Sequence, residues 1–195
     1  MTIDRARAAH AIEEFLRALG RDPAREAALV GTGARVADAW ADDLLAGYAV
    51  DVQTLLERET IPLAAGASPP PFVTLRDLEA VTMCPHHLLP SIGHVTVVFE
   101  PGARLVGVGT LSDLVDALTR RLALQEDITT AIVDALMLHL EARGAAARVV
   151  MRHGCLLARG TRRHVDVETL ATRGSLHVGG QHHGSLGLLL GASRG

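Results

Sequence analysis

A run of three prolines at residues 69–71 restricts the possible folds of this 195-residue chain more than any other feature. Proline has no backbone N–H and its ring clashes with the preceding turn, so no helix runs through this segment. Pro62 and Gly66 lie shortly before it, and the composition predicts a linker over 60–71. We therefore expect a separate N-terminal region over 1–59.

In the N-terminal region, apolar residues recur near the helical period. The pattern predicts two helices, over 5–20 and 24–57. Residues 1–20 lack the unbroken apolar stretch of a signal peptide, and no run is long enough to span a membrane. We expect a cytoplasmic protein without a membrane partner. The net charge of −3 gives no reason to expect nucleic acid as a partner.

Beyond the linker the sequence alternates like a strand. Residues 94–99 place apolar side chains on one face, and a Pro-Gly turn leads into 104–108, which predicts a β-hairpin. Two helical apolar stripes follow, from Leu111 and from Ile128. Strand-like sequence returns at 147–153 and 162–170.

This order of elements favours an α+β fold, with an antiparallel four-stranded sheet and two helices on one face, preceded by the N-terminal helical region. We expect the sheet domain over 72–175 and a Gly- and His-rich tail over 176–195. Glycines around the tail histidines argue against a preorganised metal site there. The apolar run Leu186–Leu190 is expected to be buried at an interface between copies of the chain.

Two short Cys/His clusters carry the strongest chemical signal. Cys84 and His87 are three residues apart, and Cys155, the other cysteine of the chain, follows His153 closely. Thiolates and imidazole suit tetrahedral Zn²⁺, and three protein ligands leave a position open, as in catalytic sites. The alternative is a buried cysteine beside histidines that bond to the backbone. His86 and His153 flank the ligands and could move protons at neutral pH.

The dipeptide Gln125-Glu126 lies between the two predicted helices. A solvated helix end is the simpler interpretation. A carboxylate at this position could instead accept two hydrogens from the N1–H and 2-amino edge of guanine.

Three segments together resemble the signature segments of GTP cyclohydrolase I. They are MCPHHLLP at 83–90, RRLALQE at 120–126 and HGCLLARG at 153–160. Upstream, GTGARVA at 31–37 and Gly47-Tyr48 are similar to the family's helical N-terminal segment. The resemblance covers about residues 10–175. It implies the T-fold, a homo-oligomeric ring that is usually a decamer, and active sites at subunit interfaces.

The resemblance also implies roles for individual residues. The family's zinc ligands correspond to Cys84, His87 and Cys155, and its two catalytic histidines correspond to His86 and His153. The carboxylate that binds guanine corresponds to Glu126, with Gln125 beside it. An arginine that binds phosphate corresponds to Arg159. In the implied reaction, zinc-activated water attacks purine C8 while a histidine protonates the ring, the C8–N9 bond opens and formate leaves. The ribose then rearranges and closes to give 7,8-dihydroneopterin triphosphate.

The phosphate-binding segment departs from the family pattern. Gly109 stands where the family has serine, Thr110 where it has a phosphate-binding lysine, and Asp113 where it has an arginine. Thr110 and Asp113 instead predict a capping box for a helix that begins at Leu111. Pro85, next to the first ligand, replaces the usual glutamate.

Three interpretations follow. The first is a zinc enzyme that opens the imidazole ring of a guanine-type base, nucleoside or nucleotide other than the triphosphate. The second is an ordinary GTP cyclohydrolase I with a rebuilt phosphate site, to which Arg162 and Arg163 could contribute. The third is a ring-forming relative that binds or regulates without catalysis. The complete zinc, histidine and glutamate set argues against the third.

Overall fold

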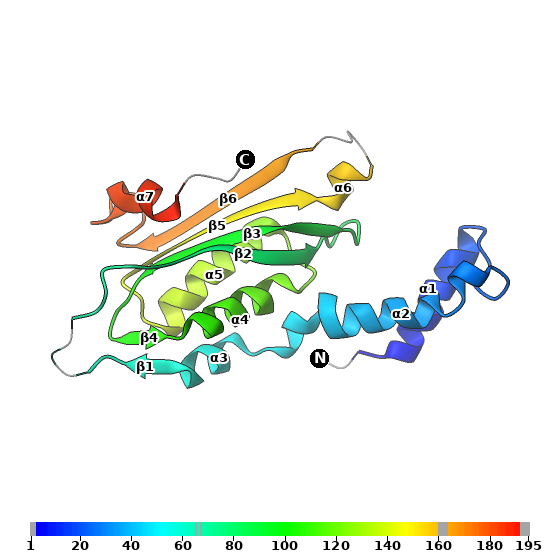
Figure 1. Ribbon diagram of the computed structural model, residues 1–195, viewed down its shortest axis with the longest axis horizontal. Helices are drawn as coiled ribbons and strands as arrows, with labels where there is room; N and C mark the ends of the chain where they lie inside the picture. Colours follow the sequence, from blue (N-terminus) through cyan, green and yellow to red (C-terminus); the bar gives the residue numbers. More distant parts are fainter. Residues whose placement is uncertain (1–2, 65, 67, 160–163, 192–195) are drawn as a thin grey trace.

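The computed structural model describes residues 3–64, 66, 68–159 and 164–191. Its main element is an antiparallel four-stranded sheet in the order β2-β3-β5-β6. The strands are β2 (Val73–Met83), β3 (Pro90–Glu100), β5 (Gly144–His153) and β6 (Asp166–Gly174). Helices α4 (Val108–Thr119) and α5 (Gln125–His139) lie together on one face, as Figure 1 shows. This is the α+β arrangement expected of a T-fold.

The N-terminal region forms an arm that extends from the sheet domain (Figure 1). It consists of α1 (Arg5–Ala18), α2 (Thr32–Ala39) and α3 (Val52–Arg58), together with the 3₁₀ helices η1 (Ala27–Leu29) and η3 (Ala46–Ala49). A π-helical segment, η2 (Trp40–Leu44), directly continues α2. The single helix predicted over 24–57 is wrong. Gly31 precedes α2 with a left-handed φ of 75°, and the Asp51 side chain caps α3 by accepting from the Thr54 N–H at 2.6 Å. These caps start new helices inside the predicted one.

The predicted hairpin between 94–99 and 104–108 is also wrong. Strand β4 (Arg104–Val106) pairs with β1 (Thr60–Pro62) in a separate two-stranded sheet. Both edges of β3 are already occupied, by β2 on one side and β5 on the other. Strand β1 lies within the segment predicted as a linker.

The start of α4 differs from the predicted capping box. The helix begins at Val108 with Gly107 as its N-cap and has no side-chain cap hydrogen bond. Thr110 is therefore inside the first turn and buried. Strand β6 begins at Asp166, later than the predicted 162–170, and residues 162–163 lie outside the described part of the chain.

The main core lies between the sheet and the helices. Its largest fully buried side chains include Val95, Val97 and Phe99 from β3, Leu114 from α4, and Ile132 and Leu136 from α5. The alternate side chains of these strands face the opposite side of the sheet. The pattern of 94–99 therefore predicted the inward face correctly.

The C-terminal segment packs on the other face of the sheet. Helix α7 (Leu186–Leu190) buries Leu186 and Leu190 against Val98 and Ala146. The Arg76 side chain donates to the Leu189 carbonyl at 2.6 Å. The Arg148 side chain donates to the Gly191 carbonyl at 2.9 Å. Leu186 and Leu190 are thus covered by their own chain, while Leu188 is exposed. Burial of this run between copies of the chain stays a prediction.

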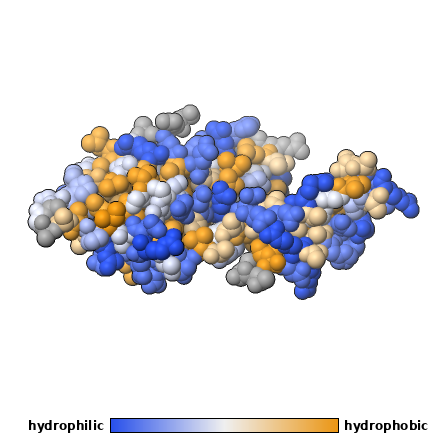
Figure 2. All heavy atoms as spheres, turned by 60° about the horizontal axis from the view of Figure 1, so that its bottom comes forward, coloured by the Kyte–Doolittle hydropathy of each residue, from blue (hydrophilic) through white to orange (hydrophobic). Residues whose placement is uncertain are grey.

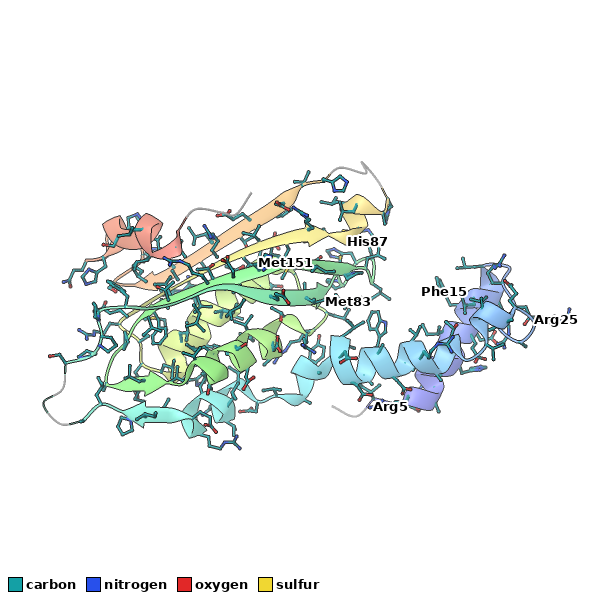
Figure 3. All side chains as sticks on the ribbon, in the orientation of Figure 1. Arg5, Phe15, Arg25, Met83, His87 and Met151 are labelled. Carbon is teal, nitrogen blue, oxygen red and sulfur yellow. The ribbon has the colours of Figure 1, made fainter. Side chains whose placement is uncertain are left out.

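The arm leaves apolar side chains exposed. In Figure 2, apolar residues gather near the end of the arm and, separately, over the sheet domain, with hydrophilic residues between them. Helix α1 has no buried residue, and Phe15, labelled in Figure 3, is 59% exposed. In the described part of the chain, no helix is both long and apolar enough to cross a membrane.

Candidate active site

A tight turn between β2 and β3 holds the first cluster at one end of the sheet. The Cys84 N–H donates to the Leu89 carbonyl at 3.0 Å, and the Leu88 N–H donates to the Cys84 carbonyl at 2.9 Å. Leu88 adopts a left-handed φ of 53°, which closes the turn. Figure 3 places His87 at this end of the sheet, beyond Met83.

The second cluster reaches the same place from β5. This strand ends at His153, and the short helix α6 (Gly154–Leu157) carries Cys155. A Cβ on Gly154 would lie 2.6 Å from the Pro90 carbonyl oxygen, so only glycine permits this approach to the start of β3. Cys155 thereby faces the β2–β3 turn.

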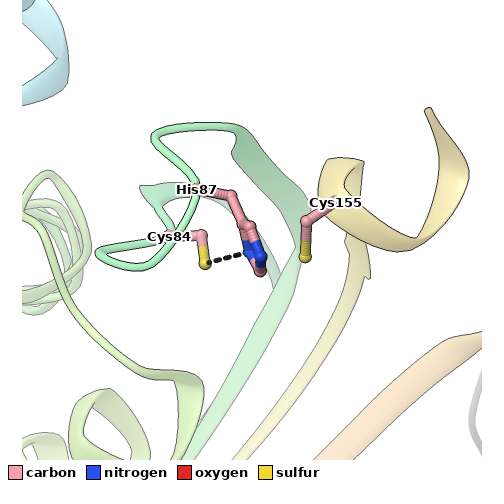
Figure 4. A group of neighbouring side chains, drawn as sticks. All are labelled: Cys84, His87 and Cys155. Atoms are coloured by element: carbon pink, nitrogen blue, oxygen red, sulfur yellow. Dashed lines mark hydrogen bonds between the residues drawn. The ribbon is translucent and has the colours of Figure 1, made fainter. Parts of the chain in front are cut away.

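The three predicted ligand atoms converge. The Cys84 and Cys155 sulfurs and a His87 nitrogen all lie within 4.8 Å of one another (Figure 4). Cys84 Sγ is 3.7 Å from His87 Nδ1. Zn–S and Zn–N bonds of about 2.3 and 2.05 Å at tetrahedral angles would separate these atoms by about 3.6 Å. The donor set and its spacing fit a zinc ion with three protein ligands.

The surroundings of Cys155 disfavour its thiolate when no cation is bound. Burial raises the pKa of the Cys155 thiol, and the nearby Cys84 raises it further, while Arg159 acts weakly in the other direction. A bound divalent cation would reverse this balance by favouring the thiolates. In the described residues, no other group of three His, Cys, Asp or Glu side chains could hold a metal ion.

A shallow hollow surrounds this cluster, and it brings together most of the residues singled out from the sequence. Its wall includes Cys84, His86, His87, Ser91, Gln125, Glu126, His153 and Cys155. His86 and Glu126 are exposed, and Glu126 lies in the first turn of α5. Arg159 is exposed and does not line the hollow. Arg162 and Arg163 lie outside the described residues.

The side chain of Gln125, expected to lie beside the substrate, has hydrogen-bond partners within the protein. Its side chain is 2% exposed, and its Nε2 donates to the carbonyls of Val149 and Val167, each at 2.9 Å. Its Oε1 lies 2.8 Å from His153 Nε2. Within this chain, both terminal atoms of the amide thus bond to protein groups.

Sequence reasoning missed Ser91, whose Oγ lies 2.9 Å from His153 Nδ1. Ser91 shares the inward face of β3 with Val95 and Val97, because side chains two residues apart point the same way. Extending the alternation of 94–99 backwards would have found this buried hydroxyl.

The altered phosphate segment lies elsewhere in the chain. Asp113 lines a different hollow, with Val50, Asp116 and Arg120 among its neighbours, and Thr110 is buried in α4. Neither residue lines the hollow around Cys84. Within one chain, therefore, these substitutions do not alter the candidate metal centre directly.

Comparisons with known proteins point to one family. A family model described as GTP cyclohydrolase I matches residues 8–184. The GTP cyclohydrolase 1 of Leifsonia xyli subsp. xyli is 39% identical over 172 residues, which are 88% of this chain and 87% of the relative. That of Thermobifida fusca is 36% identical over 178 residues, 89% of this chain and 82% of the relative.

A third relative, the GTP cyclohydrolase 1 of Allorhizobium ampelinum, is 37% identical over 80% of this chain and 75% of its own length. Among solved structures, the archaeosine synthase QueF-Like in the apo form covers 55% of this chain and 97% of its own. The TM-score is 0.45 and the identity 17%.

Proposed function

This chain belongs to the GTP cyclohydrolase I family, and on that premise we propose that it is a zinc-dependent hydrolase that opens the imidazole ring of GTP. The observation that carries the proposal is the hollow in which the convergent Cys84, His87 and Cys155 lie beside two histidines and a glutamate. The names of the relatives support GTP as the substrate.

The side chains of this hollow can divide the reaction among them. Cys84, His87 and Cys155 would hold zinc, which when bound supplies Lewis-acid activation of water. The exposed Glu126 carboxylate can accept both hydrogens of the guanine N1–H and 2-amino edge. This pairing would orient the base.

The exposed His86 can exchange protons with the purine, and His153 can do so once the substrate displaces one of its two hydrogen-bond partners, Ser91 or Gln125. Addition of water at C8 and cleavage of the C8–N9 bond yield a formamide, and a second water releases formate. The exposed Arg159, whose charge acts on Cys155, is the described arginine that we assign to a substrate phosphate.

A second candidate substrate is a guanine base, nucleoside or monophosphate. Thr110 and Asp113 favour it, because they stand where the resemblance implies two cations. A single unit-charge pair at about 5 Å and an effective dielectric of about 20 is worth roughly 3 kcal/mol before screening. These residues could influence the site only from a neighbouring copy, since they do not line the hollow within one chain.

We further propose that the chain forms a closed homo-oligomeric ring in the cytoplasm. The exposed apolar side chains of the arm, such as Phe15 and Leu19, support burial against a second copy. Light scattering at micromolar concentration should give a mass several times the 20.6 kDa of one chain. A stable monomer would contradict this assembly.

Loss of purine absorbance tests the activity directly. The zinc-loaded protein is assayed with GTP, GMP, guanosine, guanine and 8-oxoguanine, and released formate is measured in parallel. Ring opening of GTP with the highest kcat/KM supports the main proposal, and a preference for a less phosphorylated substrate supports the second candidate. Zinc binding without turnover of any of them would point to the non-catalytic alternative.

A further inference from the structure

The buried amide of Gln125 has only one orientation compatible with its neighbours. One terminal atom faces the carbonyl oxygens of Val149 and Val167, each at 2.9 Å. Carbonyl oxygens only accept hydrogen bonds, so this terminal atom must be the donating Nε2. The other terminal atom, Oε1, therefore faces His153.

This orientation determines where the imidazole of His153 carries its hydrogen. Gln125 Oε1 only accepts, and it lies 2.8 Å from His153 Nε2. The neutral ring must therefore keep its hydrogen on Nε2. Its Nδ1 is then an acceptor, and the Ser91 hydroxyl, 2.9 Å away, donates to it. Both ring nitrogens have defined partners.

Hydrogen bonds across several elements keep the amide in place. Gln125 Nε2 also lies 3.2 Å from Thr169 Oγ1 on β6, which is 2.6 Å from Thr129 Oγ1 on α5. Thr129 donates in turn to the Gln125 carbonyl at 2.7 Å. Among the described residues, no buried side-chain polar atom lacks a hydrogen-bond partner. The network is therefore fully satisfied, which favours a single arrangement.

From this network we infer that Gln125 and Ser91 are positioning residues that hold His153 in one ring orientation and in the Nε2–H tautomer. The hydrogen-bond partner of one imidazole nitrogen determines which of the two nitrogens carries the hydrogen. Here the fold holds the partners of both nitrogens in place. The inference rests on the proposed function only for the catalytic use of His153. It assigns Gln125 and Ser91 no contact with the substrate.

The tautomer can be measured without turnover. Protein labelled with ¹⁵N-histidine and loaded with zinc is studied by magic-angle-spinning NMR at pH 8.5. The His153 signals are assigned by their loss in His153→Gln. We expect the Nε2–H pattern with one ring orientation in the wild type and in Ser91→Thr, and a mixture of ring orientations in Ser91→Ala. Thr96→Val, which changes a buried side chain on the opposite face of β3, should keep the wild-type pattern.

Kinetics on GTP then test whether this positioning matters for catalysis. Ser91→Ala should lower kcat roughly ten- to hundredfold, as expected for a misplaced catalytic group, and leave KM within about twofold. Ser91→Thr should recover most of the loss, and zinc content should be equal in all variants. An Nδ1–H pattern in the wild type would overturn the inference, and so would a Ser91→Ala variant with unchanged kcat. Absence of turnover in the wild type would refute the proposed function alone, because the NMR pattern would still decide the tautomer.

Discussion

Cys84 Sγ and His87 Nδ1 lie 3.7 Å apart on one turn, close to the distance that separates two ligands of a tetrahedral zinc ion. The turn supplies both atoms, and α6 supplies the third from Cys155. The purified protein should therefore contain about one zinc per chain, and Cys84→Ala, His87→Ala and Cys155→Ala should each lose most of it. Metal analysis measures this, with His94→Ala, an exposed histidine on the other face of the sheet, as the control. Full zinc in both cysteine variants would show that the ligand assignment is wrong.

Zinc retention should depend on pH through the thiol of Cys155. Burial raises the pKa of Cys155, so its thiol is protonated near neutral pH until a metal displaces the proton. Affinity should therefore fall as pH is lowered, and zinc binding to the metal-free protein should release the proton of the Cys155 thiol. Competition with a chromophoric chelator across pH 5.5–8.5, together with proton release in weakly buffered solution, measures both. Pure Asp/Glu ligation would instead show little change over this range.

Glu126 should be needed for recognition of the guanine edge. Glu126→Ala removes a charged acceptor, so the transition state should lose about 1.5–3 kcal/mol of stabilisation. This loss lowers kcat/KM roughly 10- to 150-fold. Asp127→Ala is the matched control, because Asp127 is an exposed acid next in sequence that does not line the hollow. Equal effects of the two substitutions would indicate a general charge effect and argue against guanine recognition by Glu126.

Asp113 should weaken the use of GTP if a neighbouring copy brings it to the site. Asp113→Arg replaces a repulsive charge with an attractive one, so it should raise kcat/KM for GTP at least tenfold, and more at low salt than at high salt. Guanosine should be unaffected. The control Glu57→Arg makes the same charge change on the exposed surface of α3. A wild-type preference for GTP over guanosine of a hundredfold or more would show that Asp113 does not limit triphosphate binding.

The C-terminal helix should contribute to stability through its buried side chains. Leu190→Ala removes apolar contacts with the sheet and should lower the free energy of unfolding by about 2–3 kcal/mol. Leu188→Ala is the control on the same helix, since Leu188 is 83% exposed, and its effect should be near zero. Thermal unfolding at fixed protein concentration compares the two. Equal melting temperatures would mean that α7 is not docked in solution.

The sequence by itself determined the features that depend on local pattern. The apolar stripes of α4 and α5 predict amphipathic helices because neighbouring turns align residues three and four apart. The spacing of Cys84 and His87 suggests a metal because one turn can present both donors. The signature segments then identify the family, which the 39% identity to a relative supports over most of both chains.

Only the tertiary structure decided which segments pair and which polar groups face each other. Backbone donors and acceptors are alike in every strand, so the local sequence does not determine whether β4 pairs with β1 or with β3. Gln125 and Ser91 are ordinary polar residues in the sequence. Folding buries both side chains beside His153. A buried polar group cannot bond to bulk water, so it needs a hydrogen-bond partner within the protein. That burial is the basis on which we infer that Gln125 supports the imidazole of His153.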